Sequence, residues 1–264
     1  MSDTIAAASV LPEFRVGKVL GQTFSIFFNN FLAFFGIAVA FYAPAALFDY
    51  FFYDPQEITV LAKSDGVRGI WGQVLVSLGL NLVVMAMIQT ALLYGAIEYQ
   101  AGRRVGLSVM LQTVLRALVP VIIAALLVSI LSILGMLFLL IPGIIILVMM
   151  SMTTPAIVVE KLGPIAAMKR SSALTSGYKW PVFGVFLVLV VLLYAVMIGV
   201  GLVMGLGLDE IVMQDEQTMT LSLWQLLSSG AYYALIGSCV VAVYTNLRAA
   251  KEGATADEVA DVFA

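Results

Sequence analysis

The chain alternates between long apolar runs and short polar stretches. Five runs contain no charged residue, namely Val19–Phe48, Gly69–Ile97, Ala117–Val159, Trp180–Leu208 and Gln217–Leu247. A transmembrane helix needs about 20 apolar residues, so four of the runs have room for one span each. The third run has room for two, because Pro142-Gly143 near its middle is a turn signal. The pattern therefore predicts an all-α, polytopic membrane domain over residues 1–264, with spans near 31–52, 70–97, 118–140, 142–159, 181–208 and 225–247.

Polar residues just before the first span recur at helical steps. Arg15, Lys18, Gln22, Ser25 and Asn29 form one stripe of a helix over 14–29, and apolar residues cover the rest. A wide apolar face with a thin basic stripe suits the headgroup boundary. We expect an interfacial helix here; an extended start of the first span is the alternative.

The same spacing returns before the third and fifth spans. It runs through Ser108, Gln112 and Arg116, and again through Lys169, Ser172, Ser176 and Lys179. The sequence thus predicts three hairpins of two spans, each preceded by an amphipathic helix. A capping-box pattern at Thr255–Glu258 predicts one further short helix over 255–263.

The distribution of Lys and Arg predicts the orientation, because acidic residues contribute little to it. If the N-terminus is inside, only Lys63 and Arg68 of the 13 Lys and Arg residues lie on the outer side. Both termini are therefore expected in the cytoplasm. The first residues lack the basic start of a secretory signal, so we expect the first span to be retained as an anchor.

Composition argues against several kinds of chemistry. The chain has no histidine and one cysteine, Cys239, inside the last span. Without histidine it lacks the commonest general base and metal ligand, so we expect no catalytic residues, no metal and no cofactor. Glu98 and Glu160 are interpreted as surface ion-pair partners of neighbouring bases. Because the span interiors carry no ionisable residue, coupled transport is a less favoured interpretation.

The basic segments are the candidate binding surface. Cations near an anionic leaflet attract it, and guanidinium and hydroxyl donors together can hold a phosphate. The candidate headgroup residues are Arg103, Arg104, Arg116, Lys169, Arg170, Ser171 and Lys179; the alternative is that these bases only set the topology. Gly201 and Gly205 form a GxxxG, which predicts close helix packing within the chain or in a homo-oligomer.

The stretch from Pro142-Gly143 to Trp180 resembles a family of bacterial membrane proteins. That family is related to the membrane domain N-terminal to some glycerophosphodiester phosphodiesterases. The residues that carry the resemblance are Pro142-Gly143, Pro155, Glu160, Gly163, Ala167, Arg170-Ser171, Leu174, Gly177 and Trp180, with similar features at Val16–Lys18 and at Tyr244, Leu247-Arg248 and Glu252-Gly253. The resemblance implies a six-helix protein of the bacterial inner membrane. It does not imply phosphodiesterase activity, because the catalytic domain is absent.

The sequence therefore predicts a non-enzymatic inner-membrane protein that organises or senses phospholipid, or scaffolds an envelope partner. A transporter or flippase for a lipid-like substrate is the first alternative, and an intramembrane enzyme the second. The expected partner is anionic phospholipid of the inner leaflet, with a protein or a second copy of the chain as further candidates, but no nucleic acid. The identity of the lipid, the protein partner and the oligomeric state stay open.

Overall fold

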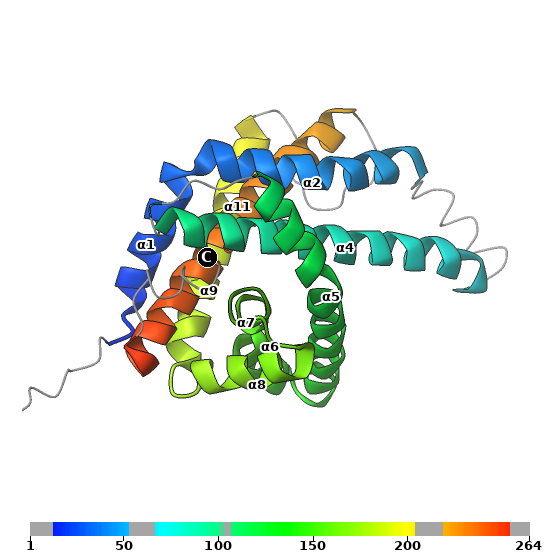
Figure 1. The fold of residues 1–264 in the computed structure, drawn as a ribbon. Helices are drawn as coiled ribbons and strands as arrows, with labels where there is room; N and C mark the ends of the chain where they lie inside the picture. Colours follow the sequence, from blue (N-terminus) through cyan, green and yellow to red (C-terminus); the bar gives the residue numbers. More distant parts are fainter. Residues whose placement is uncertain (1–12, 53–66, 101, 103–106, 204–218, 254–264) are drawn as a thin grey trace, which may run out of the picture.

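The computed structural model describes residues 13–52, 67–100, 102, 107–203 and 219–253, and every element within these ranges is a helix (Figure 1). The helices are α1 (Val16–Asn29), α2 (Phe31–Phe52), α4 (Val67–Gln100), α5 (Leu107–Phe138), α6 (Leu140–Met150), α7 (Thr153–Glu160), α8 (Pro164–Thr175), α9 (Lys179–Val203) and α11 (Met219–Glu252). The expected C-terminal helix over 255–263 lies outside the described residues.

Long apolar helices dominate the fold. Five segments are long and apolar enough to cross a membrane, and a sixth is added if α1 and α2 together make one bent span. The five are Gly79–Tyr99, Ser108–Phe138, Leu140–Glu160, Lys179–Val203 and Leu226–Glu252. The predictions of a helical fold and of several helices long and apolar enough to span a membrane are confirmed.

The first polar stripe forms a helix of its own. A bend of 77° separates α1 from the first part of α2, and Asn30 is the only residue between them. The Asn30 side-chain amide donates to the Ile26 carbonyl at 3.0 Å, which supplies a partner for the end of α1. Such a bend is inconsistent with a straight extension of the first span.

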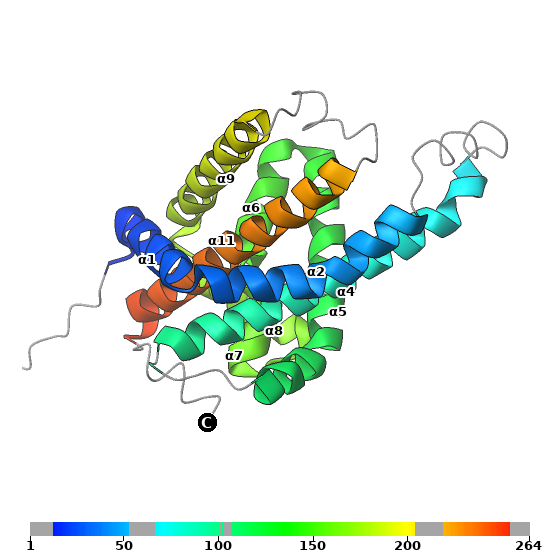
Figure 2. The same cartoon turned by 90° about the horizontal axis from the view of Figure 1, so that it is seen from above.

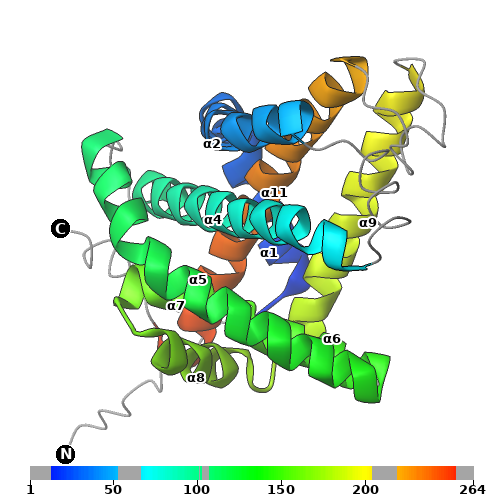
Figure 3. The same cartoon turned by 90° about the vertical axis from the view of Figure 1, so that its right-hand side faces the viewer.

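The second expected interfacial helix is not separate. Its residues are the first turns of α5, which continues through Pro120 as one helix of 32 residues. Figure 3 shows that α5 changes direction after these turns. A proline in a helix removes one backbone donor and bends the axis without having to end the helix.

The turn of the middle hairpin is tighter than predicted. Only Leu139 lies between α5 and α6, so Pro142 and Gly143 belong to the start of α6 rather than to a loop. Proline is tolerated there because the first N–H groups of a helix have no partner within it. A Cβ on Gly143 would lie 2.8 Å from the Met136 nitrogen, so glycine allows the two helices to meet.

The fourth predicted span is broken in two. The helix stops at Met150 and restarts at Thr153, with Ser151 and Met152 between α6 and α7. Pro155 therefore lies in the first turn of α7 and is not a kink within a continuous span. The predicted boundary at Glu160 agrees with the end of α7.

Helices α4 and α11 lie at the centre of the fold. Ile88, Leu92 and Leu93 of α4 and Tyr244 and Leu247 of α11 have almost no exposed surface. A Cβ on Gly237 would lie 3.0 Å from the Leu92 Cβ, which shows how closely the two helices approach. Only half of the predicted GxxxG is described: Gly201 is buried, and Gly205 lies outside the described residues.

The polar helices gather at one end of the molecule. Figure 2 shows α1, α7, α8, the first turns of α5 and the last turns of α11 on one side. The end of α2, the start of α4, the α5–α6 turn, the end of α9 and the start of α11 lie on the other. We call the first side the polar-helix end.

Candidate functional site

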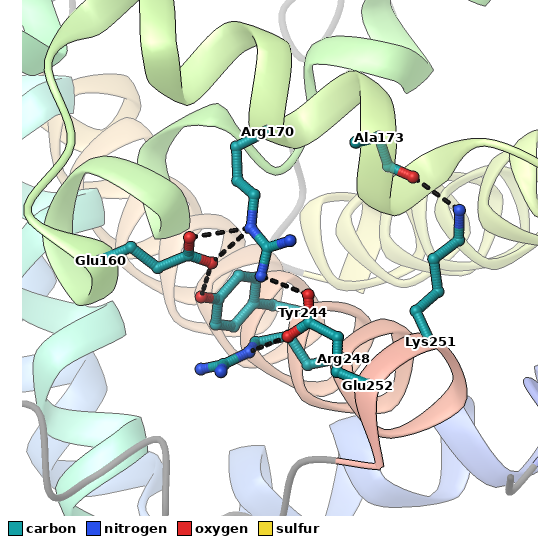
Figure 4. A network of polar contacts seen from close by, with 7 residues as sticks. All are labelled: Glu160, Arg170, Ala173, Tyr244, Arg248, Lys251 and Glu252. Carbon is teal, nitrogen blue, oxygen red and sulfur yellow. Dashed lines mark hydrogen bonds and ion pairs between the residues drawn. The ribbon is translucent and has the colours of Figure 1, made fainter.

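A cluster of charged side chains joins α7, α8 and α11 at the polar-helix end (Figure 4). The Arg170 Nε donates to both carboxylate oxygens of Glu160, at 2.9 and 2.8 Å, and Arg170 Nη2 lies 2.5 Å from Glu252 Oε1. The Tyr244 hydroxyl donates to Glu160 Oε1 at 2.9 Å. Arg248 Nε donates to Glu252 Oε2 at 3.1 Å. We call these five residues the ion-pair cluster.

Local sequence places three of its members on one face of α11. Tyr244, Arg248 and Glu252 are four residues apart, which is close to one helical turn each. The guanidinium carbon of Arg248 lies 5.9 Å from the centre of the Tyr244 ring, within reach of a cation–π contact. Just beside them, the Lys251 ammonium donates to the Ala173 carbonyl at 2.6 Å, a second link from α11 to α8.

The cluster is largely neutral and partly shielded from solvent. The side chains of Arg170 and Glu160 are 25% and 19% exposed. Burial by itself would lower the pKa of Arg170, but the hydrogen bonds that Arg170 donates to Glu160 and Glu252 outweigh it, and the pKa is raised above its ordinary value. Arg170 is therefore a permanent cation whose charge is already balanced by two carboxylates. This arrangement suits a structural tie between α8 and the end of α11.

A cleft of about 420 Å³ opens between the first turns of α5 and the α7–α8 turn. Its lining has two cations, Arg116 and Lys161, and two further polar residues, Gln112 and Thr113. The remaining walls are mostly apolar, from Tyr94, Val109, Ala117, Pro120, Ile157, Val158 and Leu162. The cleft therefore combines a basic part and an apolar part within one concave site.

The backbone at Lys161 is unusual. Lys161 follows the last residue of α7 with φ 53° and ψ 34°, in the left-handed region. Among the described non-glycine residues it is alone in having a positive φ. Glycine or asparagine normally occupies this position at a helix end, because a side chain there is unfavourable.

The structure separates the predicted headgroup residues. Arg116 and Lys169 are exposed but lie on different helices, and Lys179 is half-buried at the start of α9. Arg170 is committed to the ion-pair cluster. Arg103 and Arg104 lie outside the described residues. Within the described set, only Arg116 lines the cleft.

Ser171 has an internal role. It is fully buried, its hydroxyl donates to the Met149 carbonyl at 2.6 Å, and it accepts from the Met152 N–H at 3.0 Å. These are backbone groups that the α6–α7 break would otherwise leave unpaired. Two members of the expected phosphate site at Arg170-Ser171-Ser172, namely Arg170 and Ser171, therefore already have partners inside the protein.

Two other expectations concern acids. Glu160 was expected to pair with bases next to it in sequence, and its partners are instead Arg170 and Tyr244. Glu98 is not a surface residue, since only 6% of it is exposed. No group of three or more His, Cys, Asp or Glu side chains that could hold a metal occurs in the described part of the chain.

Sequence reasoning missed both the ion-pair cluster and the cleft. The spacing of Tyr244, Arg248 and Glu252 would have indicated a polar stripe on the last helix. Nothing in the sequence pairs that stripe with Arg170, because the partner is some 80 residues away. The cleft likewise joins Arg116 to Lys161 across two helices.

Comparison with known proteins gives no further constraint: no protein-family model matches the chain, and neither a curated protein nor a solved structure matches it.

Proposed function

We propose that this protein is a six-span membrane protein whose polar-helix end faces the cytoplasm and binds anionic phospholipid. It acts without chemistry of its own, by holding lipid headgroups at the inner leaflet. The bacterial inner membrane is the location that the charge distribution and the family resemblance favour.

The gathering of the cations at the polar-helix end carries this proposal. The lysines and arginines whose side chains are described all lie on the elements of this end or within four residues of them in sequence: Arg15, Lys18, Arg116, Lys161, Lys169, Arg170, Lys179, Arg248 and Lys251. They outnumber the carboxylates described there, which are Glu13, Glu98, Glu160 and Glu252. An excess of cations beside a membrane span attracts anionic headgroups and follows the rule for cytoplasmic segments.

The position of Arg116 on α5 also supports a location of the polar-helix end at the headgroup layer. No charged residue occurs from Ala117 to the end of α5 at Phe138. At 1.5 Å per residue this stretch is roughly 33 Å long, close to the roughly 30 Å of a hydrocarbon core. If Ala117–Phe138 crosses the core, Arg116 lies at the headgroup layer.

Lipid retention tests the proposal. The protein is extracted from membranes in mild detergent, and its bound lipids are counted by native mass spectrometry. We expect anionic lipid to be enriched among the retained molecules relative to the membrane from which the protein came. If lipids are retained in the same proportions as in the membrane, the proposal would be contradicted. The basic residues would then serve only as topology signals.

The same preparation distinguishes binding from transport. Reconstituted in liposomes with a fluorescent anionic lipid in one leaflet, the protein should leave the lipid where it was placed. Protein-dependent movement between leaflets would favour the flippase alternative.

A further inference from the structure

We propose that the cleft between the first turns of α5 and the α7–α8 turn is a binding site for the headgroup of one anionic phospholipid, with Arg116 and Lys161 as its cations. This inference rests on the proposed function and narrows it to one place and one ligand class. It also distinguishes the basic residues that bind lipid from those that pair with carboxylates and hold helices together.

The size and walls of the cleft suit a small ligand. Its volume of about 420 Å³ falls within the roughly 300–1,000 Å³ typical of small-molecule sites. Ile157 and Val158 at its base are almost fully buried, so they belong to the packed core of α7. A site with a rigid apolar base and a few polar groups is typical of ligand pockets.

Arg116 is the cation available to an incoming anion. It is exposed, and no carboxylate among the described residues pairs with it. Arg170 differs, because Glu160 and Glu252 already occupy its donors. A guanidinium binds a phosphate through two parallel N–H···O bonds, and the nearby Gln112 amide can add another donor. A phosphate that binds Arg116 would therefore gain donors without competing with a described carboxylate for this guanidinium.

The backbone of Lys161 points to the same site. Its φ of 53° is a conformation in which glycine would be less strained, yet the residue present is a long cation that lines the cleft. Unfavourable backbone conformations are found where function requires a particular side chain. Favourable interaction of the ammonium with the end of α7 is the competing explanation, and the variants below separate the two.

The apolar side of the cleft selects a lipid over a free phosphate. Pro120 lines it, and the exposed Ile123 and Ile130 continue along the same face of α5, about one and three helical turns further on. An acyl chain can follow this stripe into the bilayer while the headgroup stays with the cations. Pro120 also has no N–H, which leaves the Arg116 carbonyl without its usual helical partner and able to accept from a hydroxylated headgroup. Phosphatidylglycerol is therefore the probe of choice.

The test measures lipid affinity in detergent, where no charged surface contributes. Delipidated full-length protein is titrated with phosphatidylglycerol or phosphatidylcholine and followed by native mass spectrometry. We expect one tight phosphatidylglycerol, and Arg116→Gln should weaken it about tenfold, the order of one charge-assisted hydrogen bond. Lys161→Gly and Lys161→Asn should weaken it similarly while leaving the melting temperature unchanged or higher, because both residues suit the backbone at this position.

Lys169→Gln is the matched control, since it removes an exposed cation that lies outside the cleft. It should leave the affinity unchanged. An equal loss in Lys169→Gln and Arg116→Gln would overturn the cleft as the site, while the proposed function would stand. Equal binding of the two lipids by the unaltered protein would overturn both.

Competition with inorganic phosphate distinguishes the two sources of the anion. An excess of phosphate should not displace phosphatidylglycerol, because it lacks the acyl chains. Complete displacement would show a free-anion site and overturn the lipid assignment. A lower melting temperature in both Lys161 variants, with unchanged lipid affinity, would show that Lys161 only stabilises the end of α7.

Discussion

Adjacent residues can have quite different roles, and Arg170 and Ser171 show why. In a helix, neighbouring side chains point about 100° apart. Arg170 therefore reaches Glu160 and Glu252, whereas Ser171 points into the α6–α7 break and binds Met149 and Met152. The prediction that both contribute to one phosphate site assumed that side chains adjacent in sequence point to the same place.

Replacing Ser171 with alanine tests its internal role. The Met152 N–H and Met149 carbonyl would lose the hydroxyl that bridges them, which should cost about 1–3 kcal/mol of folding free energy. Thermal unfolding in detergent should show a lower melting temperature. Ser172→Ala is the control, because the Ser172 side chain is only half-buried. Equal melting temperatures for the two variants would show that the break does not depend on Ser171.

Elements meet where small residues allow it, and the α5–α6 hairpin is the tightest such place described. Gly135 and Gly143 face each other across a turn in which only Leu139 is not helical. A Cβ on Gly135 would lie 2.7 Å from Ile146 Cδ1 and 3.0 Å from the Gly143 Cα. Close approach of backbones lets dispersion and weak hydrogen bonds hold helices together in a membrane.

Gly143→Ala should therefore destabilise the hairpin. The new methyl group would meet the backbone of Met136, and overpacking of this kind costs roughly 1–3 kcal/mol. Gly184→Ala in α9 is the control, since nothing lies within 4 Å of its added Cβ. Because alanine is the better helix former by up to about 1 kcal/mol, that variant should be neutral or more stable. A lower melting temperature for Gly143→Ala with an unchanged or higher one for Gly184→Ala would confirm the difference; an equal fall in both would contradict it.

At the scale of the molecule, the two ends differ in kind. The polar-helix end carries the ion-pair cluster, the cleft and the cations whose side chains are described, and the opposite end carries the α5–α6 turn. The ion-pair cluster joins α8 to the last helix, so ion pairs cross-link the polar-helix end. Its partial burial makes it less sensitive to salt than exposed pairs such as Arg15 and Glu13.

Cysteine labelling tests which end is cytoplasmic. Native Cys239 has no exposed surface and should not react with a membrane-impermeant maleimide, so the unaltered chain is the control. Ser64→Cys should be labelled in right-side-out membrane vesicles, and Ser176→Cys only in inverted ones. The reverse pattern would invert the topology and move the basic cleft to the outer leaflet.

Hydrophobic pattern predicted much of the fold but not its details. The helical class, the independence of α1 and the start of α8 at Pro164 follow from local composition and spacing. The break after Met150, the continuity of α5 and the one-residue turn at Leu139 do not. The break and the turn depend on partners elsewhere: the hydroxyl of Ser171 for the break, and the facing helix for the turn.

The sequence by itself determined that the chain is helical and apolar enough to span a membrane, because hydrophobicity and charge act along the chain and need no partner. It also indicated that the bases belong together on one side. Only the tertiary structure decided which bases are used internally and which are open to a ligand. Arg170 pairs with two carboxylates, and Arg116 lines a cleft, because helix packing brings distant segments close together. Pairing over such separations is a property of the folded chain, and no local pattern encodes it.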